Sequence, residues 1–117
     1  MLILCFVYER QIIIKKNYVV KLLHNLGIPS HLDGYKYLKM ILLENYNNNK
    51  KFYTFVEQKY KIDKRIIERS IRYAIEVGWN RANYKDIEEI FGNSIEVLRS
   101  KPTNLEFINA VLERLND

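Results

Sequence analysis

Residues 64–78 have the sequence Lys-Arg-Ile-Ile-Glu-Arg-Ser-Ile-Arg-Tyr-Ala-Ile-Glu-Val-Gly, and their apolar spacing predicts an amphipathic helix. On a helical wheel the apolar and small residues fall on one side: Ile67, Ile71, Ala74, Ile75 and Gly78. This side is the expected core face, and the glycine is expected to end the helix. Asp63, immediately before the helix, is a favoured capping residue.

The opposite side of this helix is charged. Its cluster consists of Arg65, Arg69, Arg72 and Glu76. Lys64 and Arg65 lie in the first turn, where each cation opposes the helix dipole at a cost of about 0.3–1 kcal/mol. A sequence chosen for stability alone would place acids there, so the pattern favours a functional surface over an ordinary solvated face.

A shorter predicted helix, residues 52–60, precedes the basic helix, and Lys61-Ile62 forms the turn between them. A short helix, a tight turn and a longer basic helix are typical of a helix-turn-helix, whose second helix enters the DNA major groove. There an arginine can grip guanine O6 and N7, and Glu68 can accept from cytosine N4. Ile66 either contacts a thymine methyl or packs against the domain.

The rest of the chain predicts further helices over residues 18–26, 34–46, 83–92 and 103–115, with a loop over residues 45–51. Their stop and cap signals are Gly27, Pro29, Asp33, Asn83, Asp86, Gly92 and a capping box from Thr103 to Glu106. The predicted fold class is all-α: a six-helix, bundle-like domain over residues 18–117 that contains a helix-turn-helix.

Residues 1–17 form a separate apolar segment, with two β-prone runs around the polar break Glu9-Arg10-Gln11. The sequence leaves three alternatives open: a hairpin, a strand that pairs with another chain, or the start of the first helix. We therefore expect either a short amino-terminal β segment or an arm for dimerisation.

The positive charge is concentrated in the middle of the chain. Of the formal net charge of +5, residues 50–85 carry +6, which leaves −1 for the remainder. A basic middle on a near-neutral body is typical of a site for an anionic polymer, although on charge alone a solvated basic face fits equally well. The length suits one domain with a sizeable core.

Several classes of protein are disfavoured by the sequence. No apolar stretch approaches the roughly 20 residues of a transmembrane helix and no export signal is present, so a cytoplasmic protein without a membrane partner is expected. Cys5, His24 and His31 do not have zinc-ligand spacing. Without a nucleophile elbow, a phosphate-binding loop or a catalytic carboxylate pair, we expect no enzyme activity, no metal and no cofactor.

Three motifs resemble one family of regulators. Residues 67–81 (IERSIRYAIEVGWNR) resemble the recognition helix of the stage 0 sporulation protein A family, the master response regulators of sporulation initiation, in their C-terminal effector domain. Residues 101–108 resemble its last-helix signature, and residues 27–38 resemble its first loop and second helix. The resemblance covers about residues 19–115.

The resemblance implies a six-helix domain that binds double-stranded DNA at boxes with a TGTCGAA-like core, as a homodimer on tandem boxes, and regulates transcription. It also implies contact with the RNA polymerase sigma subunit after the recognition helix, where Phe91 and Gly92 are retained in a more acidic surrounding than usual. The expected DNA-binding residues are Lys64, Arg65, Ile66, Glu68, Arg69, Arg72, Tyr73, Arg81 and Lys101.

This chain also departs from the family pattern. Ile66 stands where a base-contacting arginine is usual, and Tyr73 replaces a usual histidine, so a variant box is expected. The 18 residues before Val19 are too few for a receiver domain, so we expect a stand-alone relative or a fragment. The alternative function is a protein-interaction module that antagonises or heterodimerises with a full-length regulator.

Overall fold

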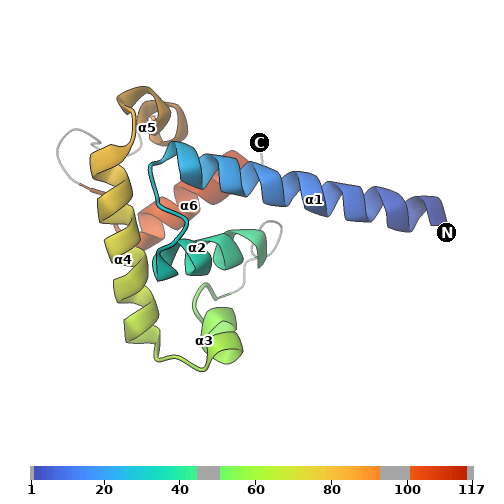
Figure 1. Ribbon diagram of the computed structural model, residues 1–117, viewed down its shortest axis with the longest axis horizontal. Helices are drawn as coiled ribbons and strands as arrows, with labels where there is room; N and C mark the ends of the chain where they lie inside the picture. Colours follow the sequence, from blue (N-terminus) through green and yellow to red (C-terminus); the bar gives the residue numbers. More distant parts are fainter. Residues whose placement is uncertain (1, 45–50, 93–100, 116–117) are drawn as a thin grey trace.

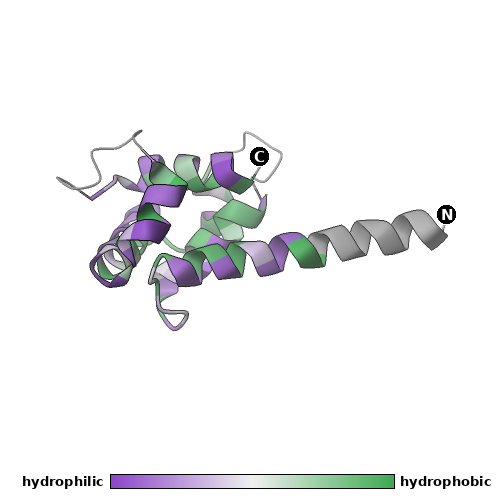
Figure 2. Ribbon diagram, turned by 90° about the horizontal axis from the view of Figure 1, so that it is seen from above, coloured by the Kyte–Doolittle hydropathy of each residue, from purple (hydrophilic) through white to green (hydrophobic). Residues whose placement is uncertain are grey.

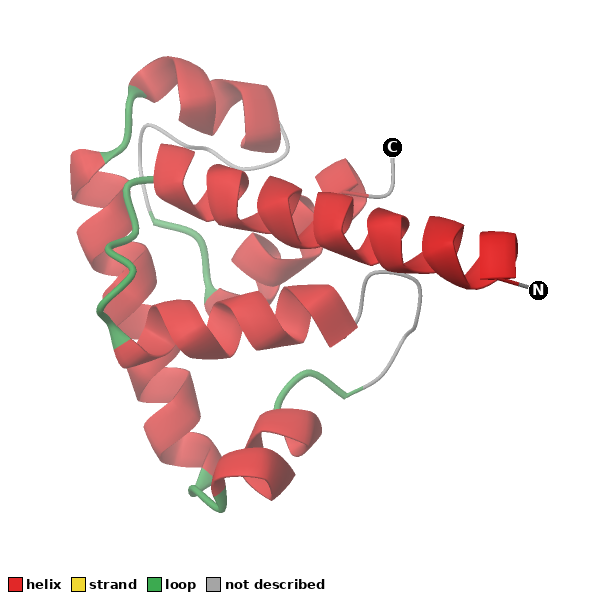
Figure 3. Cartoon of the chain, turned by 45° about the vertical axis from the view of Figure 1, so that its right-hand side comes forward, coloured by secondary structure: helices red, strands yellow, loops and turns green. Residues whose placement is uncertain are grey.

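The computed structural model describes residues 2–44, 51–92 and 101–115, with side chains from residue 13 onward. Within these residues the chain forms six helices and no strand (Figure 1, Figure 3). They are α1 (Leu2–Asn25), α2 (Asp33–Glu44), α3 (Thr54–Tyr60), α4 (Lys64–Arg81), α5 (Tyr84–Phe91) and α6 (Asn104–Leu115). The predicted all-α class is confirmed.

Of the three alternatives for the amino-terminal segment, the start of the first helix is the one that the structure shows, because α1 is one helix from Leu2 to Asn25. The possible β segment is wrong, and α1 crosses the expected boundary at residue 17. β-Branched residues favour strands only where a neighbouring strand packs against them. Residues 2–25 contain no glycine or proline, so a helix fixed at Val19–Leu26 by packing continues backward without a breaker. The amino-terminal half of α1 extends well past the other helices (Figure 1).

Helix α2 is the centre of the domain, because it contacts α1, α3, α4 and α6. Figure 2 shows hydrophobic residues turned inward between the helices and hydrophilic residues on the outer sides. The largest fully buried side chains come from five helices and from Leu26, which follows α1: Val19, Leu23, Leu26, Leu38, Ile41, Leu42, Val56, Ile67, Ile71, Ile75, Phe107 and Ile108. An aromatic row joins α4, α5 and α6, with ring centroids 5.1 Å apart for Trp79–Phe91 and 5.7 Å for Phe91–Phe107.

The basic helix was expected to end at about Gly78, and α4 continues three residues further, to Arg81. Gly78 is buried inside the helix, where an added Cβ would lie 2.6 Å from Ile28 Cγ1 and 2.7 Å from the Leu26 carbonyl oxygen. This glycine therefore permits close packing of the loop after α1 against α4. A glycine late in a helical pattern either ends the helix or allows another segment to pack closely against it. Only the tertiary contact distinguishes the two roles.

The other helix limits follow the predicted signals closely. Gly27 ends α1 with φ +77°, and the Asn83 side chain accepts from the Lys85 amide at 3.0 Å to cap α5. The capping box at α6 is complete: the Glu106 amide donates to Thr103 Oγ1 at 3.2 Å and the Thr103 amide to Glu106 Oε1 at 3.0 Å. Asp33 is already the first residue of α2 rather than its cap. Residues 45–50, most of the predicted loop, lie outside the described residues.

None of the helices in the described part of the chain is long and apolar enough to cross a membrane.

Candidate nucleic-acid interface

Helices α3 and α4 form the predicted helix-turn-helix (Figure 1). Lys61 closes α3 in the left-handed conformation, with φ 53° and ψ 48°, so the chain reverses within three residues. The Asp63 side chain then accepts from the Arg65 amide at 2.8 Å, which caps α4 as expected.

The predicted core face of α4 is confirmed. Ile67, Ile71, Ala74, Ile75 and Gly78 are the buried residues of this helix. An added Cβ on Gly34 would overlap the Ser70 carbonyl oxygen, so α2 approaches the backbone of α4 directly. This close packing fixes which side of α4 faces away from the domain.

Arg69 lies on the outward side, roughly opposite the centre of the buried face. Its side chain is exposed and has no ion pair or hydrogen bond with any residue that the structure describes. Two large hydrophobic side chains flank it along the helix: Ile66 is 50% exposed and Tyr73 is 57% exposed. The outward face therefore presents a guanidinium between two apolar groups, a combination that burial in the core would not require.

Arg65, by contrast, is held by the capping aspartate. Its Nη2 lies 3.3 Å from Asp63 Oδ2 and its Nε lies 3.4 Å from Oδ1. The side-chain hydrogen bond from Arg65 is the largest cause that holds the pKa of Asp63 below its usual value, and the amide bond adds to it. Both side chains are well exposed, so this pair is worth little stability.

Lys64 and Glu68 pair across one turn of α4. Lys64 Nζ lies 3.7 Å from Glu68 Oε1 and 5.6 Å from the centre of the Tyr53 ring. Both charged side chains remain half exposed, at 57% and 42%. The pair leaves the Glu68 carboxylate and the Lys64 ammonium on the same side of the amino end of α4.

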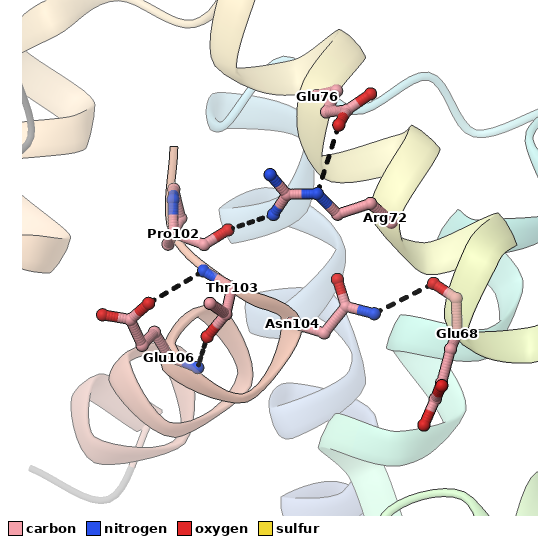
Figure 4. A network of polar contacts seen from close by, with 7 residues as sticks. All are labelled: Glu68, Arg72, Glu76, Pro102, Thr103, Asn104 and Glu106. Atoms are coloured by element: carbon pink, nitrogen blue, oxygen red, sulfur yellow. Dashed lines mark hydrogen bonds and ion pairs between the residues drawn. The ribbon is translucent and has the colours of Figure 1, made fainter. Parts of the chain in front are cut away.

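Arg72 connects α4 to the chain just before α6 (Figure 4). Its Nη1 donates to the Pro102 carbonyl at 2.6 Å, and its Nε donates to Glu76 Oε1 at 3.1 Å. One turn earlier, Asn104 Nδ2 donates to the Glu68 carbonyl at 2.9 Å. Sequence reasoning did not assign Pro102 or Asn104 to the site, although both belong to the Lys101–Asn104 motif.

The remaining predicted residues are spread more widely. Lys101 is half-buried and directly precedes Pro102, which places it beside the middle of α4. Arg81 is exposed in the last turn of α4, about 24 Å along the axis from Arg65 at 1.5 Å per residue. The described residues contain no group of three or more His, Cys, Asp or Glu side chains placed to hold a metal ion.

These features define a class: a helix-turn-helix domain with a basic outer helix, as in regulators of transcription. The family model described as "Sporulation initiation factor Spo0A C terminal" matches residues 19–115, and the chain belongs to this family of sporulation-related DNA-binding effector domains. The match begins within α1, so residues 2–18 of that helix precede it.

Proposed function

We propose that this protein is a sequence-specific, double-stranded DNA-binding regulator of transcription that acts in the cytoplasm and reads the major groove with α4. The observation that carries this proposal is the outward Arg69 without a partner among the described residues, flanked by exposed Ile66 and Tyr73. Arginine in this position recognises guanine through O6 and N7, and exposed apolar groups beside it match thymine methyls.

Each predicted residue has a role in this proposal. Arg69 contacts guanine, Ile66 contacts a thymine methyl, and Glu68 accepts from cytosine N4 after exchanging its contact with Lys64. Tyr73 extends the apolar part of the face. The basic residues on the flanks contact phosphates or guide the approach of DNA: Lys64, Arg65, Arg81 and Lys101. Arg72, whose guanidinium is bonded to Pro102 and Glu76, supports the face from its flank. The preferred site is a TGTCGAA-like box or a variant of it, because Ile66 cannot donate hydrogen bonds to a base.

Binding as a homodimer on tandem boxes is part of the proposal. The projecting half of α1 extends away from α4, so an arm at that end leaves the DNA-facing helix free (Figure 1). Contact with the sigma subunit of RNA polymerase is proposed through the surface of α5, whose Glu88 is exposed and whose Glu89 pairs with Arg114 at 2.9 Å.

A second candidate function is a protein-interaction module that binds a full-length regulator and blocks it. The observation that favours it is the exposure of Ile13 and Ile14, at 58% and 60%, on the projecting part of α1. In that case the chain would capture the regulator without binding a duplex by itself.

Fluorescence anisotropy with a labelled duplex separates these functions. The chain is expected to bind a TGTCGAA duplex more tightly than a scrambled duplex of equal length. Arg69→Ala is expected to weaken cognate binding by about 1–3 kcal/mol and to leave scrambled binding nearly unchanged. Lys21→Ala, which removes an exposed charge from α1, is the matched control. Equal binding of both duplexes by the unmodified chain would reject sequence-specific reading.

A further inference from the structure

The amino end of α6 lies against the flank of α4, immediately beside the outward face (Figure 4). Two polar contacts join them: Arg72 Nη1 to the Pro102 carbonyl at 2.6 Å and Asn104 Nδ2 to the Glu68 carbonyl at 2.9 Å. Positions 68 and 72 are one helical turn apart, so α4 is held at two successive points along the same side. Two such points restrict both rotation of α4 about its axis and sliding along it.

The segment that makes these contacts is itself well fixed. Pro102 is buried and has a restricted φ, and the reciprocal bonds between Thr103 and Glu106 define the start of α6. Phe107 and Ile108 anchor the first turn in the core, with 1% and 0% exposure. The support is therefore more rigid than a surface loop.

The Asn104 amide is only partly satisfied by the residues that the structure describes. Its Nδ2 donates to Glu68, whereas its Oδ1 is buried without a hydrogen-bond partner among the described residues. A buried acceptor left unsatisfied is costly, and native structures keep few of them. An apolar residue of the same branched shape would avoid that cost, so the amide is explained by its polar contacts. These are the bond that it donates to the Glu68 carbonyl of α4 and a side-chain interaction with Tyr53.

The buried face of α4 sets which side of the helix points outward, and the two polar contacts add directional restraints at the edge of that side. Base recognition tolerates only about 0.5 Å and 10–20° of displacement in the groups that perform it. Arg69 follows Glu68 directly and precedes Arg72 by less than one turn. The two contacts with α6 therefore bracket the residue whose orientation matters most for reading a base.

We propose that Arg72 and Asn104 are positioning residues for DNA recognition, which fix α4 on the amino end of α6 so that Arg69 meets its base in one orientation. This inference rests on the proposed DNA-reading function. It assigns Arg72 a role through Pro102, and it adds Asn104 to the residues that determine specificity.

Two variants test the proposal. Asn104→Leu removes the donor and the unsatisfied acceptor while it keeps the branched shape of the side chain, and Arg72→Lys keeps the charge but loses the forked geometry. Each is expected to lower the ratio of cognate to scrambled affinity about tenfold, as expected when one bidentate base contact is misplaced. Affinity for the scrambled duplex and the dependence of binding on salt should stay unchanged. Arg114→Lys, at the other end of α6, is the matched control.

Each outcome has a defined meaning. Ratios within about twofold of the unmodified chain in both variants would overturn the proposal. A second result would also overturn the proposal. In it, Arg72→Ala reduces the slope of log binding constant against log salt concentration by about one, while Arg72→Lys keeps full specificity. Arg72 would then be a phosphate contact. Amide hydrogen exchange in the free protein provides a readout that does not depend on DNA. Faster exchange in α4 of the variants than in α4 of the unmodified chain, with exchange in α2 unchanged, supports the restraint of α4 by these two residues, and unchanged exchange in α4 contradicts it. If α4 loosens but the unmodified chain does not discriminate between duplexes, the DNA-reading function fails and not the restraint.

Discussion

The Arg65 guanidinium folds back onto the carboxylate of Asp63, with Nη2 3.3 Å from Oδ2, while the same carboxylate accepts from the Arg65 amide at 2.8 Å. One aspartate thus caps α4 and pairs with the first arginine on it. In the proposed complex with DNA, binding of phosphate by Arg65 would compete with this contact, so the cap also sets the charge that the amino end of α4 presents.

Substituting Asp63 by asparagine is expected to strengthen DNA binding. Asparagine caps helices as well as aspartate does, so α4 should persist, while the competing negative charge disappears. We expect tighter binding to cognate and scrambled duplexes alike, because a phosphate contact carries no sequence information. Glu113→Gln, an exposed acid near the end of α6, is the control in the same anisotropy assay. Weaker binding by Asp63→Asn than by this control would contradict the prediction.

Stability is expected to fall at acid pH through Asp63 and Glu106. Hydrogen bonds from Arg65 hold the pKa of Asp63 below its usual value, and those from Thr103 do the same for the pKa of Glu106. As pH falls, the two carboxylates of the unfolded chain are therefore protonated before those of the folded chain. Their contribution to the free energy of unfolding is fully present above the pKa values of the unfolded chain. It is lost as pH falls through the lowered pKa values of the folded chain. Urea unfolding at a series of pH values should show this loss.

The double variant Asp63→Asn/Glu106→Gln should reduce the acid dependence of that unfolding midpoint. An unchanged slope below the usual carboxyl pKa values would show that these two caps do not contribute to it.

Gly34→Ala is expected to destabilise the fold by about 1–3 kcal/mol, because overpacking at a close contact forces the backbones apart. The added methyl would overlap the Ser70 carbonyl oxygen and lie 2.7 Å from Ala74 Cβ. Alanine is otherwise favoured over glycine in a helix, so higher helix propensity alone would raise the stability. The sign of the change in stability therefore distinguishes overpacking from the effect of helix propensity. Thermal unfolding monitored by circular dichroism measures it, with Lys36→Ala on the exposed side of α2 as the control. Equal or greater stability of Gly34→Ala would show that α2 and α4 are less closely packed.

Ile66→Arg is expected to tighten binding to the TGTCGAA duplex about tenfold, since an arginine there can make a bidentate base contact worth about 1–3 kcal/mol. Half of the Ile66 side chain is exposed, so the substitution should not disturb the core. Ile66→Leu serves as the control, because it keeps an apolar side chain of equal size. An equal gain on the scrambled duplex would mean that the new arginine contacts only phosphate.

Local patterns in the sequence predict much of this fold. The helical wheel identified all five buried residues of α4, and the caps at Asp63, Asn83 and Thr103–Glu106 are present as predicted. These features depend on residues within one or two turns of each other. The amino-terminal segment was less predictable, because its β-branched residues favour a strand while the adjoining packed helix extends through them.

Long-range contacts account for what the sequence could not predict in the site. The Arg72 guanidinium donates to the Pro102 carbonyl, thirty residues further along the chain. Gly78 leaves room for Ile28 from the loop after α1. Neither relationship has a local signature. The outward position of Arg69 was predictable from helical period alone, but its lack of an ion pair or hydrogen bond with residues 13–44, 51–92 and 101–115 could be established only from the fold.

The most direct test of major-groove reading replaces single guanines in the TGTCGAA duplex by 7-deazaguanine, which lacks the N7 acceptor in the major groove. Replacement of guanine by inosine, which removes the minor-groove amino group instead, provides the control. If Arg69 reads a guanine, one 7-deazaguanine position should weaken binding of the unmodified chain, and Arg69→Ala should be insensitive to that position. Equal sensitivity of both proteins at every position, or no sensitivity of the unmodified chain, would contradict the account.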